Sequence, residues 1–214
     1  MTYNIISTGS SGNAVVFNDI IMIDCGVSFK ALQDIYKKLK IVLLTHIHSD
    51  HFNAATIKKL AFERPSLRFA CCEWLVEPLI NTGVKKQNID VINVGNKYDY
   101  SAFSLSPIQL HHNVPNCGYR LFLGAEKAMY ATDTGTLDGI SAKEYDYYFI
   151  EANYTDEEMA ERIAEKQAEG VYPYEYEVMK NHLSKAKCDN FIYENAGGNS
   201  KYLYLHQHIE KVIL

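Results

Sequence analysis

The chain has 214 residues, of which 47% are hydrophobic and 22% are charged. This balance is typical of a globular protein with a full core and excludes a disordered or low-complexity chain. The formal net charge of −5 excludes an overall basic surface for holding nucleic acid nonspecifically, although metal ions can supply positive charge locally.

The strands and helices predicted for the first half of the chain begin with a strand meander. Short apolar or alternating segments between turn residues predict strands. Apolar residues at helical spacing after the capping residues Ser28 and Asn53 predict helices. Pro78 would strain or end the third predicted helix. In chain order, we expect strands at 3–7, 14–18 and 20–24, a helix at 28–39, a strand at 41–45, a helix at 53–62, a strand at 67–71 and a helix at 73–80.

The second half begins with a run of strands and ends with two helices and a strand. Thr155 with Glu158 forms a predicted capping box, and Gly170 marks the end of that helix. We expect strands at 90–94, 103–111, 119–123, 128–132 and 147–152, helices at 156–169 and 184–195, and a strand at 202–206. Together the segments predict one α/β domain over residues 1–214, with mixed sheets and outer helices.

The cysteines and the N-terminal sequence bear on the cellular compartment. The five cysteines include no CxxC pair, which favours reduced thiols over a disulfide framework. The first residues lack the features of a signal peptide, and no stretch approaches the roughly 18 apolar residues that span a bilayer. We therefore expect a cytoplasmic protein without a membrane partner, located in the host cytoplasm if the chain is phage-encoded.

Histidines concentrate at the predicted strand ends. Strand ends in an α/β sheet converge on one edge, where ligand sites form. Most of the eight histidines lie at or just after a predicted strand. The eight are His46, His48, His51, His111, His112, His182, His206 and His208.

The densest group is the string Thr45-His46-Ile47-His48-Ser49-Asp50-His51. His46 and His48 are two residues apart at a strand end, so their side chains point to one face. Asp50 and His51 follow where the chain turns and can approach the same spot. Four imidazole or carboxylate ligands in six residues suit zinc, iron or manganese. The alternative is a polar loop with surface histidines, which the specificity of H-x-H-x-D-H disfavours.

The H-x-H-x-D-H string resembles the signature of the metallo-β-lactamase superfamily. That resemblance implies an αββα sandwich, with two mixed β-sheets and helices on the outer faces, which usually binds two metals. Residues 9–13, 24–26 and 45–51 resemble motifs of the YycJ/WalJ-like exonuclease branch. Further segments resemble motifs of that branch and of ribonuclease Z: His112-Asn113-Val114-Pro115-Asn116-Cys117-Gly118-Tyr119, residues 131–135, residues 151–154 with 182–184, and Leu205-His206.

The resemblance implies two divalent cations, with zinc as the first choice and manganese or iron as alternatives. His112 is preferred over His111 because its spacing to Pro115 and Gly118 matches the motif, and His111 is expected on the opposite strand face. His182 and His206 compete for the last ligand position, and family order favours His206. The implied ligands are His46, His48 and His112 for one metal, Asp50, His51 and His206 for the other, and Asp133 between them.

The resemblance also implies catalytic roles. Two metals would activate a hydroxide nucleophile near neutral pH and neutralise charge on the phosphate oxygens. Asp50 would orient or deprotonate the nucleophile, and His182 would act as general acid toward the leaving alkoxide. Glu151 would hold the His182 imidazole in one tautomer and raise its pKa, or alternatively make a local salt bridge.

Three further features have two interpretations each. Residues 9–13 form either a turn approaching the metal edge, which we favour, or a phosphate loop, which the missing lysine disfavours. Asp24 is expected to be a buried support for the metal loop and not a ligand. Tyr172, Tyr174 and Tyr176 either stack nucleobases over the site or pack on their own domain or on a dimer partner.

The most favoured function is hydrolysis of phosphodiester bonds by a nuclease or nucleic-acid phosphodiesterase. One alternative is a cyclic mononucleotide phosphodiesterase of the phage anti-signalling type; another is an ester, thioester or lactam hydrolase of the same fold. A non-enzymatic binding protein is a minor fourth reading. Ribonuclease Z itself is disfavoured, because only twenty residues between His112 and Asp133 leave no room for a long tRNA-gripping arm. The expected partner is a nucleic acid or nucleotide, and a homodimer is an option because ribonuclease Z relatives are often dimers.

Overall fold

The chain forms two compact units, residues 1–107 (unit 1) and 108–214 (unit 2). This is a computed structural model that describes residues 1–207. His208, expected at the surface, lies outside the described residues. The expectation of one domain over residues 1–214 stays a prediction.

The first sheet is six-stranded, with the order β1-β2-β3-β4-β5-β6. The β1–β2 and β2–β3 pairs are antiparallel, whereas β3 to β6 pair in parallel. The meander and the later strands are thus confirmed, with ends shifted by a few residues. The bounds are Tyr3–Ser7 (β1), Ala14–Phe17 (β2), Ile21–Ile23 (β3), Ile41–Leu43 (β4), Arg68–Cys71 (β5) and Ile89–Val91 (β6).

Two helices of unit 1 confirm the sequence signals. The side chain of Asn53 caps α1 (Ala54–Glu63) by accepting a hydrogen bond from Thr56 N at 3.0 Å. The predicted helix at 73–80 is a 3-10 turn (η2, Glu73–Leu75) continuing into α2 (Val76–Asn81). Pro78 does not end α2, because it occupies the first turn, where backbone N–H groups have no partner within the helix.

The helix predicted over 28–39 is wrong beyond its first turn. Only a 3-10 turn forms (η1, Phe29–Leu32), and the chain continues as turns. The guanidinium of Arg64, at the end of α1, donates hydrogen bonds to the backbone carbonyls of Tyr36 and Leu39, at 2.6 and 3.1 Å. Arg64 therefore caps two carbonyls near the end of this segment, where a helix would also leave them without a partner of its own, and holds the turns that form in place of the helix.

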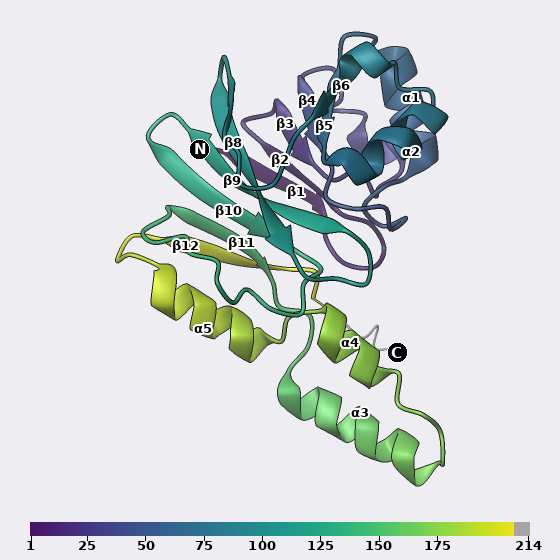
Figure 1. The fold of residues 1–214 in the computed structure, drawn as a ribbon, viewed down its shortest axis with the longest axis vertical. Coiled ribbons are helices and arrows are strands. Elements are labelled where there is room, and N and C mark those ends of the chain that lie inside the picture. The colour runs from purple at the N-terminus through teal and green to yellow at the C-terminus, as the bar shows by residue number, and fades with distance from the viewer. Residues whose placement is uncertain (208–214) are drawn as a thin grey trace. The chain divides into compact units, whose positions relative to one another are not determined.

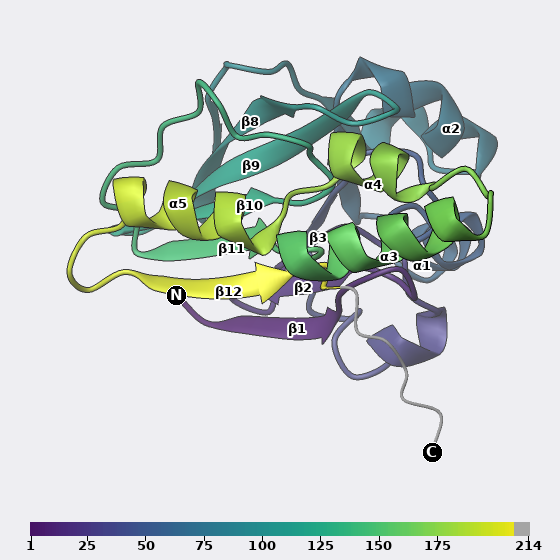
Figure 2. The same ribbon diagram turned by 90° about the horizontal axis from the view of Figure 1, so that it is seen from below.

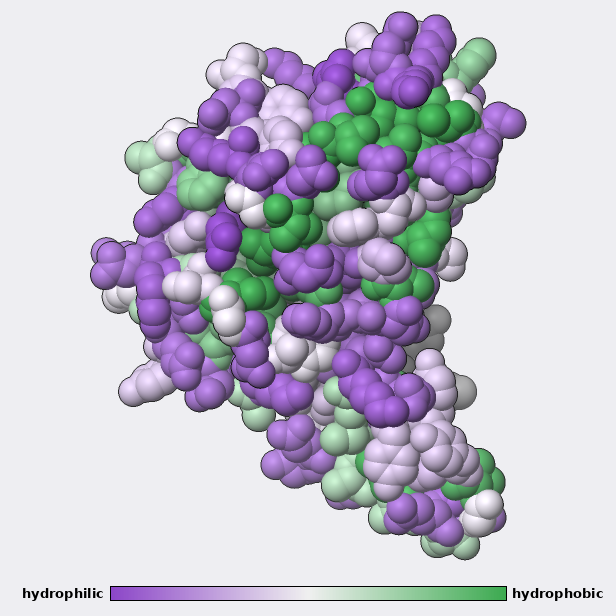
Figure 3. Space-filling model, in the orientation of Figure 1, coloured by the Kyte–Doolittle hydropathy of each residue, from purple (hydrophilic) through white to green (hydrophobic). Residues whose placement is uncertain are grey.

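Alternate residues of the unit 1 strands bury one face against the helices. Val42 and Phe69 share a core with Ile57 and Leu60 of α1 and with Leu79 of α2. In Figure 1 α1 and α2 lie beside β4 to β6, and hydrophobic surface gathers over this region at the upper right of Figure 3. A short 3-10 turn, Lys86–Asn88 (η3), precedes β6.

The second sheet has the order β12-β11-β10-β9-β8-β7. It is also mixed, because β10–β11 and β11–β12 are parallel whereas β7–β8 and β9–β10 are antiparallel. All of these strands except the short β7 match a predicted segment, and the two mixed sheets confirm the α/β class. The bounds are Tyr98–Tyr100 (β7), Phe103–Leu110 (β8), Asn116–Leu123 (β9), Glu126–Ala131 (β10), Tyr147–Glu151 (β11) and Lys201–Leu205 (β12).

The helices of unit 2 follow β11. The predicted capping box is present at α3 (Asp156–Ala168), and α5 (Lys185–Asn195) begins at the capping side chain of Ser184. The tyrosine-rich segment that follows α3, for which no helix or strand was predicted, contains a further short helix, α4 (Glu175–Asn181). In Figures 1 and 2, α5 runs alongside β10 to β12, whereas α3 and α4 lie side by side.

Candidate metal centre

In unit 1, the loop that follows β4 brings three histidines together. Nε2 of His46 lies 3.2 Å from Nδ1 of His48, and the rings of His46 and His51 are 4.2 Å apart. Ile47, between the first two, is 40% exposed and points away. Asp50 is half-buried, and its Oδ2 lies 3.5 Å from Nε2 of His51. The structure thus gathers the side chains that the string of residues 45–51 predicts as ligands.

Asp24, which directly follows β3, supports this loop through hydrogen bonds. Its carboxylate is fully buried and lies 2.7 Å from Nδ1 of His51 through Oδ2. Its Oδ1 accepts hydrogen bonds from the backbone N–H and the hydroxyl of Thr45, at 3.0 and 2.9 Å. A carboxylate at Nδ1 fixes the tautomer that leaves a lone pair on Nε2, the atom that would bind a metal. This geometry supports the interpretation of Asp24 as a positioning residue.

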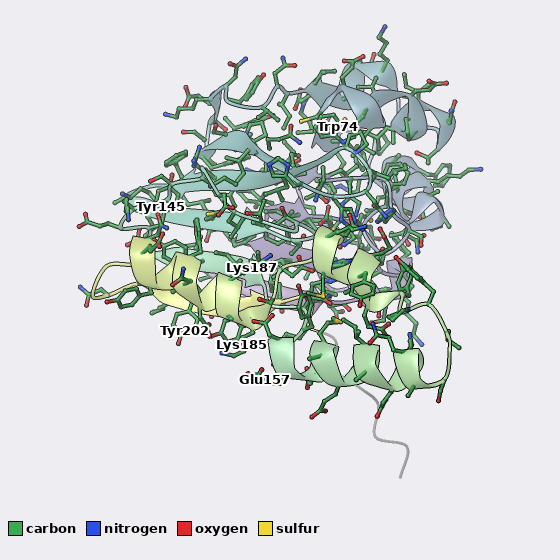
Figure 4. The ribbon with its side chains drawn as sticks, turned by 60° about the horizontal axis from the view of Figure 1, so that its bottom comes forward. Trp74, Tyr145, Glu157, Lys185, Lys187 and Tyr202 are labelled. Carbon is green, nitrogen blue, oxygen red and sulfur yellow. The ribbon has the colours of Figure 1, made fainter. Side chains whose placement is uncertain are left out.

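The turn at residues 9–13 also reaches the loop. The side-chain nitrogen Nδ2 of Asn13 lies 2.8 Å from Nε2 of His51. The backbone N–H of Asn13 donates to Asp50 O at 2.6 Å. A Cβ on Gly26 would collide with the same carbonyl of Asp50, so only glycine allows this approach. The indole of Trp74, labelled in Figure 4, donates to Thr45 O at 3.3 Å. The ligand loop is therefore fixed from several sides.

In unit 2, the candidate residues come from the ends of neighbouring strands. β10, β11 and β12 run parallel, so their carboxyl ends meet at one edge of the sheet. Asp133 follows β10, Glu151 ends β11 and His206 follows β12, while His182 follows α4. One ligand atom from each of these four residues lies within 4.8 Å of the others.

Glu151 is the centre of this cluster. It is fully buried, and its Oε1 lies 2.6 Å from Nδ1 of His182 and 3.2 Å from Nδ1 of His206. Its Oε2 accepts hydrogen bonds from the backbone N–H groups of Thr134 and Leu183, at 3.1 and 3.3 Å. Burial alone would raise the pKa of Glu151, but its hydrogen bonds with the two histidines lower the pKa overall.

The two imidazoles differ in how they face Asp133. Nε2 of His206 lies 3.6 Å from Oδ1 of Asp133, so its outer nitrogen points at the predicted bridging carboxylate. His182 instead presents Nδ1 to that oxygen, at 3.7 Å. Burial would lower the pKa of His182, but the hydrogen bond and charge of Glu151, with the charge of Asp133, raise it overall. This geometry favours His206 as ligand and His182 as acid, although the assignment stays a prediction.

Three candidate residues have left-handed backbone conformations. The φ angles of Asp24, Asp133 and His206 are 61°, 59° and 50°, a region that costs energy for residues other than glycine. Asp24 and His206 directly follow a strand, and Asp133 lies two residues after the end of β10. This backbone strain at the candidate centre is typical of functional sites.

His111 and His112 have different surroundings. Nδ1 of His112 lies 3.0 Å from Asn181 O, and its ring is 5.3 Å from that of His182. His111 is exposed, and its backbone N–H donates to Thr134 Oγ1 at 3.0 Å. Unit 2 therefore places His112, the histidine preferred from the motif, beside the predicted acid.

The chemistry of these donors suits a first-row divalent metal. Imidazole nitrogens and carboxylate oxygens are its usual ligands. In each unit a buried carboxylate, Asp24 or Glu151, also contacts Nδ1 of a candidate histidine and can orient its ring. Sequence reasoning missed several supporting residues. Asn153 donates from Nδ2 to His206 O at 2.9 Å, and Asn181 accepts from His112 through its backbone. Asn153 lies within the motif at 151–154, but a backbone acceptor such as Asn181 has no sequence signal.

Comparison with known proteins defines the family. Residues 20–180 match the β-lactamase superfamily domain, so the chain belongs to that superfamily. Its fold is that of the metallo-β-lactamases, and members of the fold family bind divalent metals and act as hydrolases. No curated protein sequence matches the chain. Among residues 1–207, no helix has both the length and the apolar character needed to cross a bilayer.

Three solved structures share this fold. The metallo-β-lactamase fold protein YhfI from Bacillus subtilis has a TM-score of 0.74 at 18% identity, covering 98% of this chain and 87% of its own. Human tRNase Z, short form, has a TM-score of 0.71 at 15% identity, covering 97% and 93%. Zinc-bound PqqB from Methylobacterium extorquens has a TM-score of 0.65 at 9% identity, covering 97% and 89%. At these identities the likeness shows the fold alone.

Proposed function

We propose that the chain is a metal-dependent phosphodiesterase that hydrolyses nucleic acid, a nuclease of the YycJ/WalJ-like and ribonuclease Z-like branch. The observation that carries the proposal is the Glu151–His182 pair, 2.6 Å apart, beside Asp133. A buried carboxylate that orients a partly exposed imidazole provides a proton donor held in one direction. The fold shared with human tRNase Z supports the same class of reaction.

In this proposal, each unit contributes residues that hold divalent cations, zinc being the first choice. Bound cations would lower the pKa of a water molecule and neutralise charge on the phosphate. Zinc-bound PqqB supports this choice, because that protein has the same fold. The proposed ligands are His46, His48, Asp50 and His51 in unit 1, and His112, Asp133 and His206 in unit 2.

The chain's own residues would divide the proton transfers. Asp50 would orient the attacking water or take its proton, because its carboxylate is half-buried beside His51. His182 would give a proton to the leaving alkoxide, and its side chain, 19% exposed, has access to a substrate atom. Glu151 touches no substrate in this scheme and acts as a positioning residue.

Exposed tyrosines beside α4 support a nucleic-acid substrate. Tyr172 and Tyr174 are 68% and 65% exposed, and the ring of Tyr172 lies 6.1 Å from that of Tyr176. Exposed aromatic rings stack nucleobases without sequence preference. A dimer contact through these rings would instead appear as a dimer in sedimentation equilibrium.

A direct assay tests the reaction class. Purified protein supplied with zinc or manganese should hydrolyse bis(4-nitrophenyl) phosphate, and a chelator should abolish turnover. Cleavage of a thioester or lactam with no turnover of this phosphodiester would reject the proposal. Labelled single-stranded DNA, RNA and a set of 3′,5′-cyclic nucleotides then distinguish a nuclease from a cyclic mononucleotide phosphodiesterase.

A further inference from the structure

Unit 2 contains a shallow hollow beside His112. It has a volume of about 440 Å³ and lies between the loop that follows β8 and the end of α4. The loop contributes His111, His112 and Asn113, and the helix end contributes Lys180 and Asn181. Because the His112 ring lies 5.3 Å from that of His182, the hollow borders the proposed proton donor.

Lys180, His111 and Asn113 bring groups that can donate hydrogen bonds to the hollow, and the amide of Asn113 also carries an acceptor oxygen. None of the described residues that line the hollow has a carboxylate. The side chains of His111 and Asn113 are exposed and have no hydrogen-bonding partner within residues 1–207. Lys180 is 67% exposed, and its ammonium pairs at 2.7 Å with Glu177, which does not line the hollow. In a chain with a net charge of −5, a hollow with this composition favours an anionic group.

Both walls of the hollow are fixed to the loop that carries Asp133. His111 donates its backbone N–H to Thr134 Oγ1 at 3.0 Å and accepts from Gly135 N at 2.9 Å. On the other wall, the backbone carbonyl of Lys180 packs so closely on Gly135 that a Cβ there would collide with it. The backbone segments that carry these side chains are thus held in a defined position relative to the loop that carries Asp133.

We propose that this hollow binds a second phosphate of the substrate, adjacent in the strand to the phosphate that is cleaved. The inference rests on the proposed function and specifies its substrate class. Phosphate oxygens accept hydrogen bonds from lysine, imidazole and amide donors. A cyclic mononucleotide has a single phosphate and leaves these donors unused, so the hollow selects a nucleic-acid strand over a cyclic mononucleotide.

The test compares one substrate that has a single phosphate with one that has several. Bis(4-nitrophenyl) phosphate serves as the first and a single-stranded oligonucleotide as the second. Lys180→Ala and His111→Ala should lower kcat/KM for the oligonucleotide about five- to tenfold relative to the small diester, mainly through KM, because each removes one phosphate contact. The slope of log KM against log salt for the oligonucleotide should also fall by about 0.7 in Lys180→Ala.

Two variants serve as controls. Lys201→Ala removes an exposed lysine from β12 in the same unit and should leave the ratio between the two substrates unaltered. Glu177→Gln removes the carboxylate that pairs with Lys180, so it should lower KM for the oligonucleotide, the opposite direction from Lys180→Ala. Circular dichroism of each variant confirms that it is folded.

The possible results separate the two proposals. In one result, the native protein turns over both substrates, and Lys180→Ala and His111→Ala change the ratio between them no more than Lys201→Ala does. That result overturns the second-phosphate site and leaves the phosphodiesterase proposal intact. Faster turnover of cyclic mononucleotides than of the strand also overturns it. No turnover of any phosphodiester by the metal-supplied native protein rejects both proposals.

Discussion

The candidate residues of the two units are assembled in different ways. In unit 1 they come from one short loop, where His46, His48 and His51 lie within six residues. In unit 2, Asp133, Glu151 and His206 lie far apart in sequence and meet because β10, β11 and β12 are parallel neighbours. A local string of ligands can be recognised without a fold, whereas the second cluster exists only once the sheet has formed.

Despite this difference, a buried carboxylate orients a candidate histidine in both units. Asp24 in unit 1 and Glu151 in unit 2 are fully buried carboxylates that hold an imidazole at Nδ1, at 2.7 and 2.6 Å. Asp24 holds one histidine, whereas Glu151 contacts both His182 and His206. Loss of Glu151 should therefore have wider consequences than loss of Asp24.

The largest expected effect separates the two histidines that share Glu151. His182→Ala should lower turnover of bis(4-nitrophenyl) phosphate by about 10²–10⁴-fold, the range for a lost general acid, while its metal content stays at the native level. His206→Ala should instead lose bound metal, measured by elemental analysis. A loss of one metal equivalent in His182→Ala would show that the two roles are reversed.

The next effect compares the supporting carboxylates. Asp24→Asn and Glu151→Gln should each weaken zinc binding about 10–100-fold, because an outer partner sets the tautomer of its histidine. Only Glu151→Gln should also lower the turnover of metal-loaded protein, because Glu151 also orients His182. Competition with a chromogenic chelator measures the affinity. Asp19→Asn is a matched control, because Asp19 has the same φ of 61° as Asp24 but forms an exposed ion pair with Lys38. An equal loss of affinity in Asp19→Asn would contradict the supporting role.

A third prediction concerns the glycines at which backbone packs on backbone in each unit. Gly26→Ala would press on Asp50 O in unit 1, and Gly135→Ala on Lys180 O in unit 2. Each should reduce the free energy of unfolding by about 3 kcal/mol or more, at the upper end for overpacking, as measured by urea denaturation. Gly198→Ala meets no atom within 4 Å and should change it by less than about 0.5 kcal/mol.

The smallest expected effect is the rate at which the five thiols react in native protein, because all five are free and buried. Burial raises the pKa of Cys71 and of Cys188 to about 12, so both remain protonated at pH 8 and the thiolate fraction grows only as the pH rises toward that value. Native protein should react slowly with Ellman's reagent, and denatured protein should expose all five thiols. Labelling in increasing urea, read by mass spectrometry, then shows whether the thiols of unit 1 or of unit 2 become accessible first. Rapid reaction of Cys71 or Cys188 in the native protein would contradict the assigned burial.

Most strands and capped helices could be predicted because their signals are local. Asn53 and Thr155 cap the helices that they were expected to start, and alternating apolar residues locate the strands. The errors have long-range causes. In the segment predicted as a helix at 28–39, Arg64 holds the turns that form instead by donating to the carbonyls of Tyr36 and Leu39. The short helix α4 lies in a segment of alternating tyrosines, where Lys166 pairs with its first residue, Glu175, at 2.7 Å.

The amino-acid sequence by itself determined the family, the α/β class and the ligand string after β4, because neighbouring residues carry those signals and adjacent positions on a strand share a face. Only the tertiary structure decided that Glu151 contacts two histidines, that Asp24 supports His51, and that His111 and Lys180 line one hollow. These relations join residues tens of positions apart, and their distances are set by the parallel pairing of strands and by the burial of polar groups that must find partners.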